Sequence, residues 1–204
     1  MIRPKGQGGM TLVELVVAMS MLSVVLLIFT SVLASVQRTV VENQRYSEAN
    51  DAARLALQQL DRELRSGNVI NDPATPPTGY PANNSLLIYT QANLPTRGQA
   101  QCEIWKITTG HELQVRRWIA GSSTWETGWR TVAEHIVNRT TGVNAFEMNS
   151  DPLKGERTVD IRLQVNPELV AQPGRTIDIR GSLTGRNTSY NYPTNICQAL
   201  PSAA

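Results

Sequence analysis

Near its N-terminus the chain contains an uncharged, mostly apolar stretch that is long enough to cross a membrane. No charged residue occurs between positions 15 and 37. As an α-helix these residues would extend for about 34 Å, and the hydrocarbon core of a bilayer is about 30 Å thick. We therefore predict a transmembrane segment at about 15–37.

Beyond this segment the apolar positions change to a single stripe. Apolar or small residues recur in steps of three and four, at Tyr46, Ala49, Ala53, Leu57, Leu60 and Leu64. This spacing places them on one face of a helix. No Gly or Pro interrupts residues 38–65, and Gly67 suits a left-handed cap. We predict one helix over 10–66, apolar all round in its first half and amphipathic in its second, where it packs on a sheet.

After the helix the period changes from 3.6 to 2. Residues 67–84 contain four prolines and are expected to form a loop. Strands are then predicted at 85–90, 102–108, 112–119, 128–137, 143–148, 158–165 and 175–183. The expected fold is α+β: a long N-terminal helix packed on an antiparallel β-sheet head that comprises 85–204.

The charges set the orientation of the predicted membrane segment. Arg3 and Lys5 account for the whole formal charge of +2. Short basic flanks remain on the cytoplasmic side, so the chain after the segment is expected to be exported. The rest of the chain is neutral, whereas a protein that binds nucleic acid by neutralising phosphates needs a basic body. Nucleic acid is therefore not an expected partner.

Glu14 is an acidic residue at the start of an otherwise apolar helix, and a charge there needs a physical reason. One reason is local: Thr11-Leu12-Val13-Glu14 has the form of a capping box, and a carboxylate in the first turn suits the helix dipole. The other reason is a cation supplied by another chain at the same depth. Capping does not explain the glycines at positions 6, 8 and 9, just upstream.

Residues 8–15, Gly-Gly-Met-Thr-Leu-Val-Glu-Leu, resemble the class III signal of type IV pilins and pseudopilins. The resemblance implies that prepilin peptidase removes a cytoplasmic leader, residues 1–9, by cleavage between Gly9 and Met10. It also implies N-methylation of Met10. In this family the glutamate that corresponds to Glu14 pairs with the terminal amine of a neighbouring subunit. Met10 departs from the phenylalanine that is commonest at its position.

A more diffuse resemblance concerns the rest of the chain. Residues 57–65, which include Asp-Arg-Glu-Leu-Arg, and the order of Trp105, Arg116 and Phe146 are similar to W-type minor pilins of type IV pili and to J-type minor pseudopilins of type II secretion. The implied role is a minor subunit, acting in filament initiation or at the tip with other pilin subunits. Type IV pilus, type II secretion and competence systems remain open, as does a single-span anchored binding domain that never polymerises.

Two cysteines, Cys102 and Cys197, lie in the part expected outside the cytoplasm, where oxidation is possible. We favour a disulfide between them over two separate thiols, because it would anchor the C-terminal tail. His111 and His135 have no ligand residues at suitable spacing, so no metal is expected. No catalytic or nucleotide-binding motif occurs, and we predict a non-enzymatic protein without a cofactor.

Three tryptophans flank a predicted turn at 121–124, namely Trp118, Trp125 and Trp129. Aromatic residues at a loop tip could contact a partner, and core packing from one hairpin would explain them equally well. Arg116 and Arg117 add a small basic spot, where a solvated face is the simplest interpretation and DNA contact a less favoured one.

Overall fold

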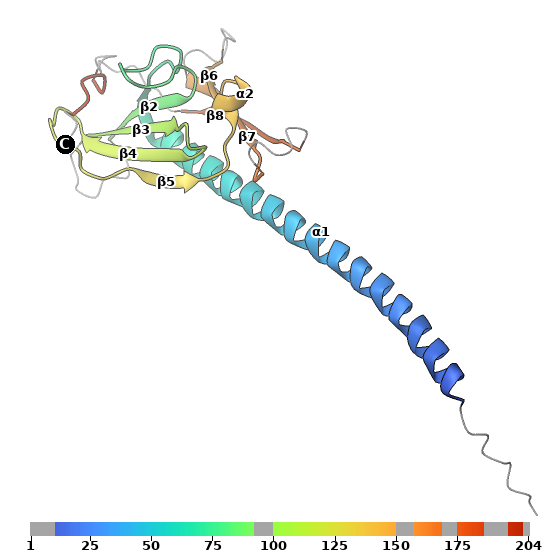
Figure 1. Cartoon of the computed structure of the whole chain (residues 1–204). Helices are drawn as coiled ribbons and strands as arrows, with labels where there is room; N and C mark the ends of the chain where they lie inside the picture. The colour runs from blue at the N-terminus through green and yellow to red at the C-terminus, as the bar shows by residue number, and fades with distance from the viewer. Residues whose placement is uncertain (1–10, 92–99, 150–156, 169–174, 186–195, 202–204) are drawn as a thin grey trace, which may run out of the picture. The chain divides into compact units, whose positions relative to one another are not determined.

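A computed structural model describes residues 11–91, 100–149, 157–168, 175–185 and 196–201 (Figure 1). The chain divides into two compact units, Met1–Arg45 and Tyr46–Ala204. Helix α1 (Leu12–Ser66) supplies the described part of the first unit and continues into the second.

In the first unit, the large apolar side chains of α1 are exposed. Their exposed fractions run from 46% at Val17 to 79% at Leu12. The helix is long and apolar enough to cross a membrane. An exposed apolar surface of this kind is not stable against water, so it needs lipid or the apolar surface of another protein around it.

The second unit contains two antiparallel sheets and the second half of α1. The larger sheet has strands in sequential order: β1 (Gly67–Ile70), β2 (Ser85–Thr90), β3 (Gln101–Ile107), β4 (Leu113–Ile119) and β5 (Arg130–Ala133). The smaller sheet has the order β6 (Phe146–Met148), β7 (Thr158–Val165) and β8 (Ile177–Thr184). A short helix, α2 (Asn138–Thr141), lies between β5 and β6 in sequence. This confirms the predicted α+β class, a long helix followed by an antiparallel head.

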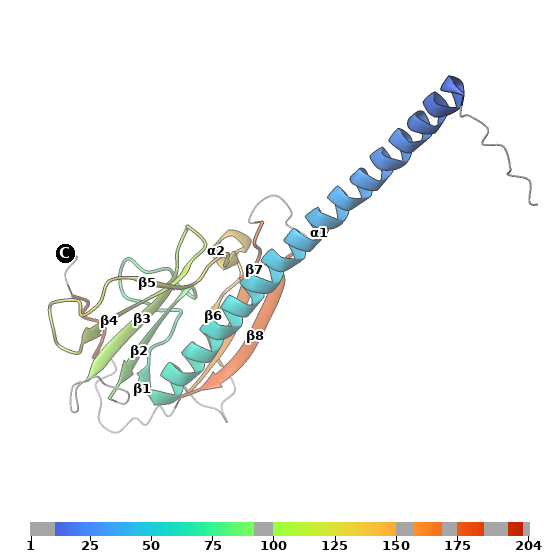
Figure 2. The same ribbon diagram turned by 90° about the horizontal axis from the view of Figure 1, so that it is seen from below.

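The main core lies between α1 and both sheets (Figure 2). The predicted helical stripe faces it: Ala53, Leu60 and Leu64 are fully buried and Ala49 nearly so. The sheets contribute large buried side chains, among them Trp105, Phe146, Ile161 and Leu163. Leu57 packs against Gly181 of β8, where a Cβ atom would lie 3.3 Å from a Leu57 methyl carbon. Glycine at this position of β8 thus leaves room for the Leu57 side chain of α1.

The expectation that residues 67–84 form a loop was wrong at its start. Gly67–Ile70 forms β1, which pairs with β2 through Val69 opposite Tyr89 and Ile70 opposite Ile88. Gly67 is not a left-handed cap, since it is not among the residues with positive φ. Its role is steric, because a Cβ atom there would lie 2.9 Å from Cγ2 of Ile88 and 3.1 Å from the Leu64 carbonyl oxygen. The helix therefore passes directly into a strand.

An ion-paired triad connects α1 to the larger sheet. The guanidinium of Arg117 on β4 donates to Glu103 on β3 from Nε at 3.1 Å and Nη2 at 3.0 Å. The same Nη2 donates to Glu63 of α1 at 3.1 Å. Glu103 is 1% exposed. Burial, with the nearby Glu63 charge, raises the pKa of Glu103 to about 7 even though Arg117 opposes the shift.

We predict that the head becomes less stable as the pH rises through 7. The folded state holds the Glu103 proton more tightly than the unfolded chain, so this stabilisation is complete below the ordinary glutamate pKa and is lost above the raised pKa of the folded state. The loss between pH 5 and pH 8 is roughly 2–3 kcal/mol. Urea unfolding of wild type and Glu103→Gln at both pH values measures it, and Gln at this position should flatten the dependence. Glu134→Gln, at an exposed acid, is the control, and an unchanged slope in Glu103→Gln would contradict the assignment.

Candidate functional site

The described chain begins at the N-terminus of α1, where Thr11 and Glu14 form a reciprocal capping box. The Glu14 amide donates to Oγ1 of Thr11 at 3.3 Å. Oε2 of Glu14 accepts hydrogen bonds from the Thr11 amide and hydroxyl, both at 3.3 Å. The Leu15 amide donates to the Thr11 carbonyl at 3.2 Å and closes the first turn. The capping box predicted for Thr11 and Glu14 is therefore present. Gly9 and Met10 lie outside the described residues.

The capping box leaves the charge of Glu14 unbalanced. Thr11 contributes neutral donors only, and no ion pair to Glu14 occurs among the residues that the structure describes. The helix around it is exposed and apolar. In an apolar medium an unpaired carboxylate is costly, although less so near the membrane edge than at its centre. A cation from outside the described chain would stabilise it.

Four hydroxyl groups within the apolar part of α1 are satisfied by the helix itself. Ser20, Ser23, Thr30 and Ser31 donate to the carbonyl oxygens of Val17, Met19, Leu26 and Ile28 at 2.7–2.9 Å. A polar group that is unsatisfied in lipid would cost several kcal/mol. This part of the helix is thus compatible with a membrane despite its hydroxyls.

Residues 4–30 match the family model for the prokaryotic N-terminal methylation motif. The chain carries the prepilin-type signal of type IV pilins and pseudopilins. The match contains Gly9, Met10 and Glu14 and ends within the apolar part of α1. It supports a pilin-like or pseudopilin-like substrate of prepilin peptidase, anchored in the inner membrane by a single segment and bearing a head domain. No curated protein and no solved structure was found to match the chain.

The head of this prepilin-type chain carries its cysteines on the face of the larger sheet that points away from α1. Cys102 of β3 and Cys197 lie with their sulfur atoms 2.05 Å apart and their Cα atoms 5.7 Å apart. Both are fully buried in a second core, with Leu87, Ile104 and Trp118. Ile196 and Leu200, on either side of Cys197, pack against this core. The bond would therefore hold the C-terminal segment on the sheet, and the pairing stays a prediction.

Oxidised native protein should contain no free thiol. Replacing both residues, as Cys102→Ser with Cys197→Ser, should reduce the free energy of unfolding by about 2–4 kcal/mol, because the unfolded chain then regains its loop freedom. Thiol titration under denaturing conditions checks the first expectation and urea unfolding the second. Reductant should destabilise the wild type and leave the double variant unchanged. Two titratable thiols in unreduced native protein would contradict the bond.

The sequence left open whether the three tryptophans pack in the core or form a contact surface, and the structure differs among them. Trp118 is fully buried and makes an edge-on contact with Trp125 at 5.1 Å between ring centroids. Trp125 and Trp129 are only partly buried, with centroids 6.4 Å apart. Trp118 is thus a core residue, and the other two form the border between this core and solvent.

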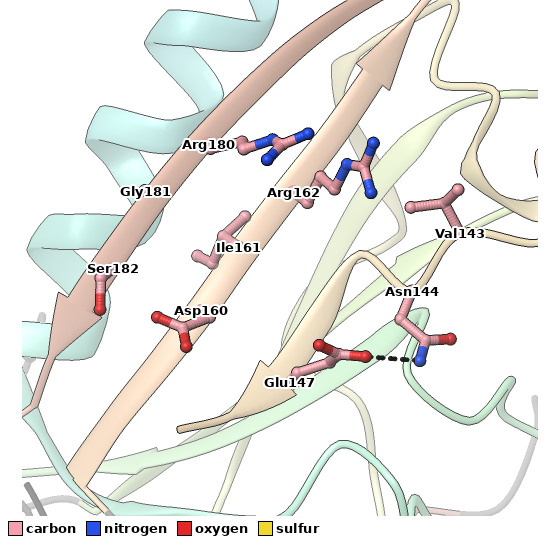
Figure 3. A pocket seen from close by; sticks show the side chains of 9 residues that line it. All are labelled: Val143, Asn144, Glu147, Asp160, Ile161, Arg162, Arg180, Gly181 and Ser182. Atoms are coloured by element: carbon pink, nitrogen blue, oxygen red, sulfur yellow. Dashed lines mark hydrogen bonds between the residues drawn. The ribbon is translucent and has the colours of Figure 1, made fainter. Parts of the chain in front are cut away.

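The smaller sheet presents a groove of about 600 Å³ on its outer surface (Figure 3). Its lining includes Glu147 and Asp160, which face each other across β6 and β7, and Arg162 and Arg180. Asp178 pairs with Arg162 at 2.6 Å and with Arg180 at 2.8 Å, and these bonds lower the pKa of Asp178 to about 2. The arginines are thus already engaged by an acid of the same sheet.

His111 and His135 both lie outside the helices and strands. Both have left-handed backbone conformations, with φ of 63°. In the described ranges, no three His, Cys, Asp or Glu side chains come together as a metal site would require.

Proposed function

We propose that the chain is a minor pilin-like subunit of a type IV pilus. Prepilin peptidase removes residues 1–9, Met10 becomes the methylated N-terminus, and the subunit enters the filament from the cytoplasmic membrane. The observation that carries this proposal is the methylation-motif match over residues 4–30, together with the exposed apolar side chains of the first part of α1.

Electrostatics supplies the reason for cleavage at Gly9. Hydrolysis of that peptide bond creates an ammonium group on Met10, four residues before Glu14. In a bundle of apolar helices each of these charges is costly alone, and together they stabilise one another. Glu14 of one subunit and Met10 of a neighbour shifted along the filament axis satisfy both charges. The pair then sets the register of each added subunit.

The two parts of α1 have different tasks in this proposal. The part at about 15–37 spans the membrane with its N-terminus in the cytoplasm, as Arg3 and Lys5 favour. On assembly, the helices of neighbouring subunits replace lipid around its exposed apolar side chains. The second part stays packed in the head, which lies outside the cytoplasm and meets the heads of other subunits.

Assignment to a minor subunit rests on the resemblance of residues 57–65 to minor pilins and on a head larger than most major pilins have. Such a subunit acts in filament initiation or at the tip. A minor pseudopilin of type II secretion or of a competence system shares the signal and the fold class. The other class, an anchored binding domain that does not polymerise, has no need of an ammonium beside Glu14.

Substitutions at Gly9 and Glu14 separate processing from assembly. Gly9→Val should abolish cleavage, because the peptidase requires a small residue there, and should leave the longer precursor in the membrane. Glu14→Val should be cleaved normally and be largely absent from sheared filaments, because the Met10 ammonium then lacks its partner. Immunoblots of membrane and filament fractions measure both. Glu48→Gln, at an exposed acid further along α1, is the matched control, and normal incorporation of Glu14→Val would contradict the pairing.

A further inference from the structure

The face of the larger sheet that points away from α1 carries a group of stacked cations and rings. We define this basic-aromatic face by Tyr80, Lys106, Arg116, Trp125 and Trp129. Lys106 is the penultimate residue of β3 and Arg116 lies in β4, both on the same side of the sheet as Cys102 and Trp118. The aromatic residues come from the connections before β2 and before β5. All five side chains are partly exposed.

Rings and cations alternate across this face. Lys106 Nζ lies 3.7 Å from the ring centroid of Trp129 and 5.9 Å from that of Tyr80. The guanidinium carbon of Arg116 lies 3.9 Å from the centroid of Trp125 and 5.8 Å from that of Trp129. Arg116 is also held by a 2.9 Å hydrogen bond from Nε to the Thr127 carbonyl. Cation–π contacts fix both positive groups in place without neutralising them.

These cations have no acidic partner in the described part of the chain. No ion pair there involves Lys106, Arg116 or the nearby Arg139. Burial lowers the pKa of Lys106, and the charges of Arg116 and Arg139 lower it further. The arginines on the smaller sheet differ, because Asp178 pairs with them. The basic-aromatic face therefore carries positive charge in a fixed position, with no acid paired to it among the described residues.

The geometry favours a short run of carboxylates over other anions. Sugars and nucleic-acid bases bind by stacking on ring faces, but Lys106 and Arg116 already cover one face of Trp129 and of Trp125. A phosphate polymer also needs a larger basic surface than Lys106, Arg116 and the nearby Arg139 provide on a body whose net formal charge is zero. Trp, Tyr and Arg, in contrast, are the residue types that dominate the binding energy of protein interfaces.

We propose that the basic-aromatic face binds an acidic segment on the head of a neighbouring subunit. The inference rests on the proposed function, which brings heads together in a filament. Carboxylates of the partner accept hydrogen bonds from Lys106 and from the terminal nitrogens of Arg116. The rings exclude water around these pairs and so strengthen them.

Binding of oligoglutamate to the full chain in zwitterionic nanodiscs tests the proposal. Fluorescence anisotropy of the labelled peptide gives the affinity, and oligoglutamine and an oligothymidylate of equal charge are the comparison probes. Lys106→Glu should weaken oligoglutamate binding at least about tenfold, and Arg139→Glu should also weaken it. Arg157→Glu makes the same charge change at an exposed position of the head and should alter the affinity less than about twofold.

Three outcomes would overturn the proposal. Absence of oligoglutamate binding, or an equal loss in Arg157→Glu, would show that the face has no specific affinity for carboxylates. Tighter binding of oligothymidylate would assign it to nucleic acid instead. If Lys106→Glu loses its near-ultraviolet circular dichroism, its tertiary packing is disturbed. The affinity of Arg139→Glu, at an exposed residue, is then compared with that of Arg157→Glu. Because the assay involves neither cleavage nor polymerisation, its failure leaves the results for Gly9 and Glu14 variants unaffected.

Discussion

The carboxylate of Glu14 at the start of an apolar helix is the main physical constraint on this protein. Thr11 orients this group with neutral donors, and the described chain offers it no cation. A charge in an apolar medium is stable only with a counter-charge nearby. The prepilin-type signal supplies a route to one, since cleavage after Gly9 would place an ammonium at the same depth. The capping box thus orients the Glu14 carboxylate without neutralising its charge.

The same balance of charge and burial recurs in the head, with different outcomes. Glu63 and Glu103 share Arg117 where α1 meets the larger sheet, so both acids face one cation inside the protein. Asp178, in contrast, forms ion pairs with two arginines at the surface of the smaller sheet. Lys106 and Arg116 stack on the rings of Trp129 and Trp125 instead of pairing with acids of the described chain. At the helix contact an arginine thus pairs with acids, whereas on the face that points away from α1 the described cations pair with rings.

Periodicity predicted the long helix and most strands, because burial on one face forces a repeat that can be read along the chain. The stripe of Ala53, Leu60 and Leu64 is buried as expected. β1 was missed because Gly67–Ile70 is too short to show alternation and exists only through pairing with β2. The Arg117 triad and the Lys106–Trp129 stack join strands and loops that are distant in sequence, so no local pattern reveals them. A glutamate at position 103, inside an apolar strand, was the available sign of a buried partner.

Intact mass spectrometry of the native protein, purified from the membrane of its own host, tests whether Met10 carries the ammonium that would pair with Glu14. We expect a mass that lacks residues 1–9 and includes one added methyl group, with the methyl on the amine of Met10. A protein that retains Met1 through Gly9 would have no ammonium beside Glu14. That result would contradict the charge pair and leave a head tethered to the membrane by a simple anchor.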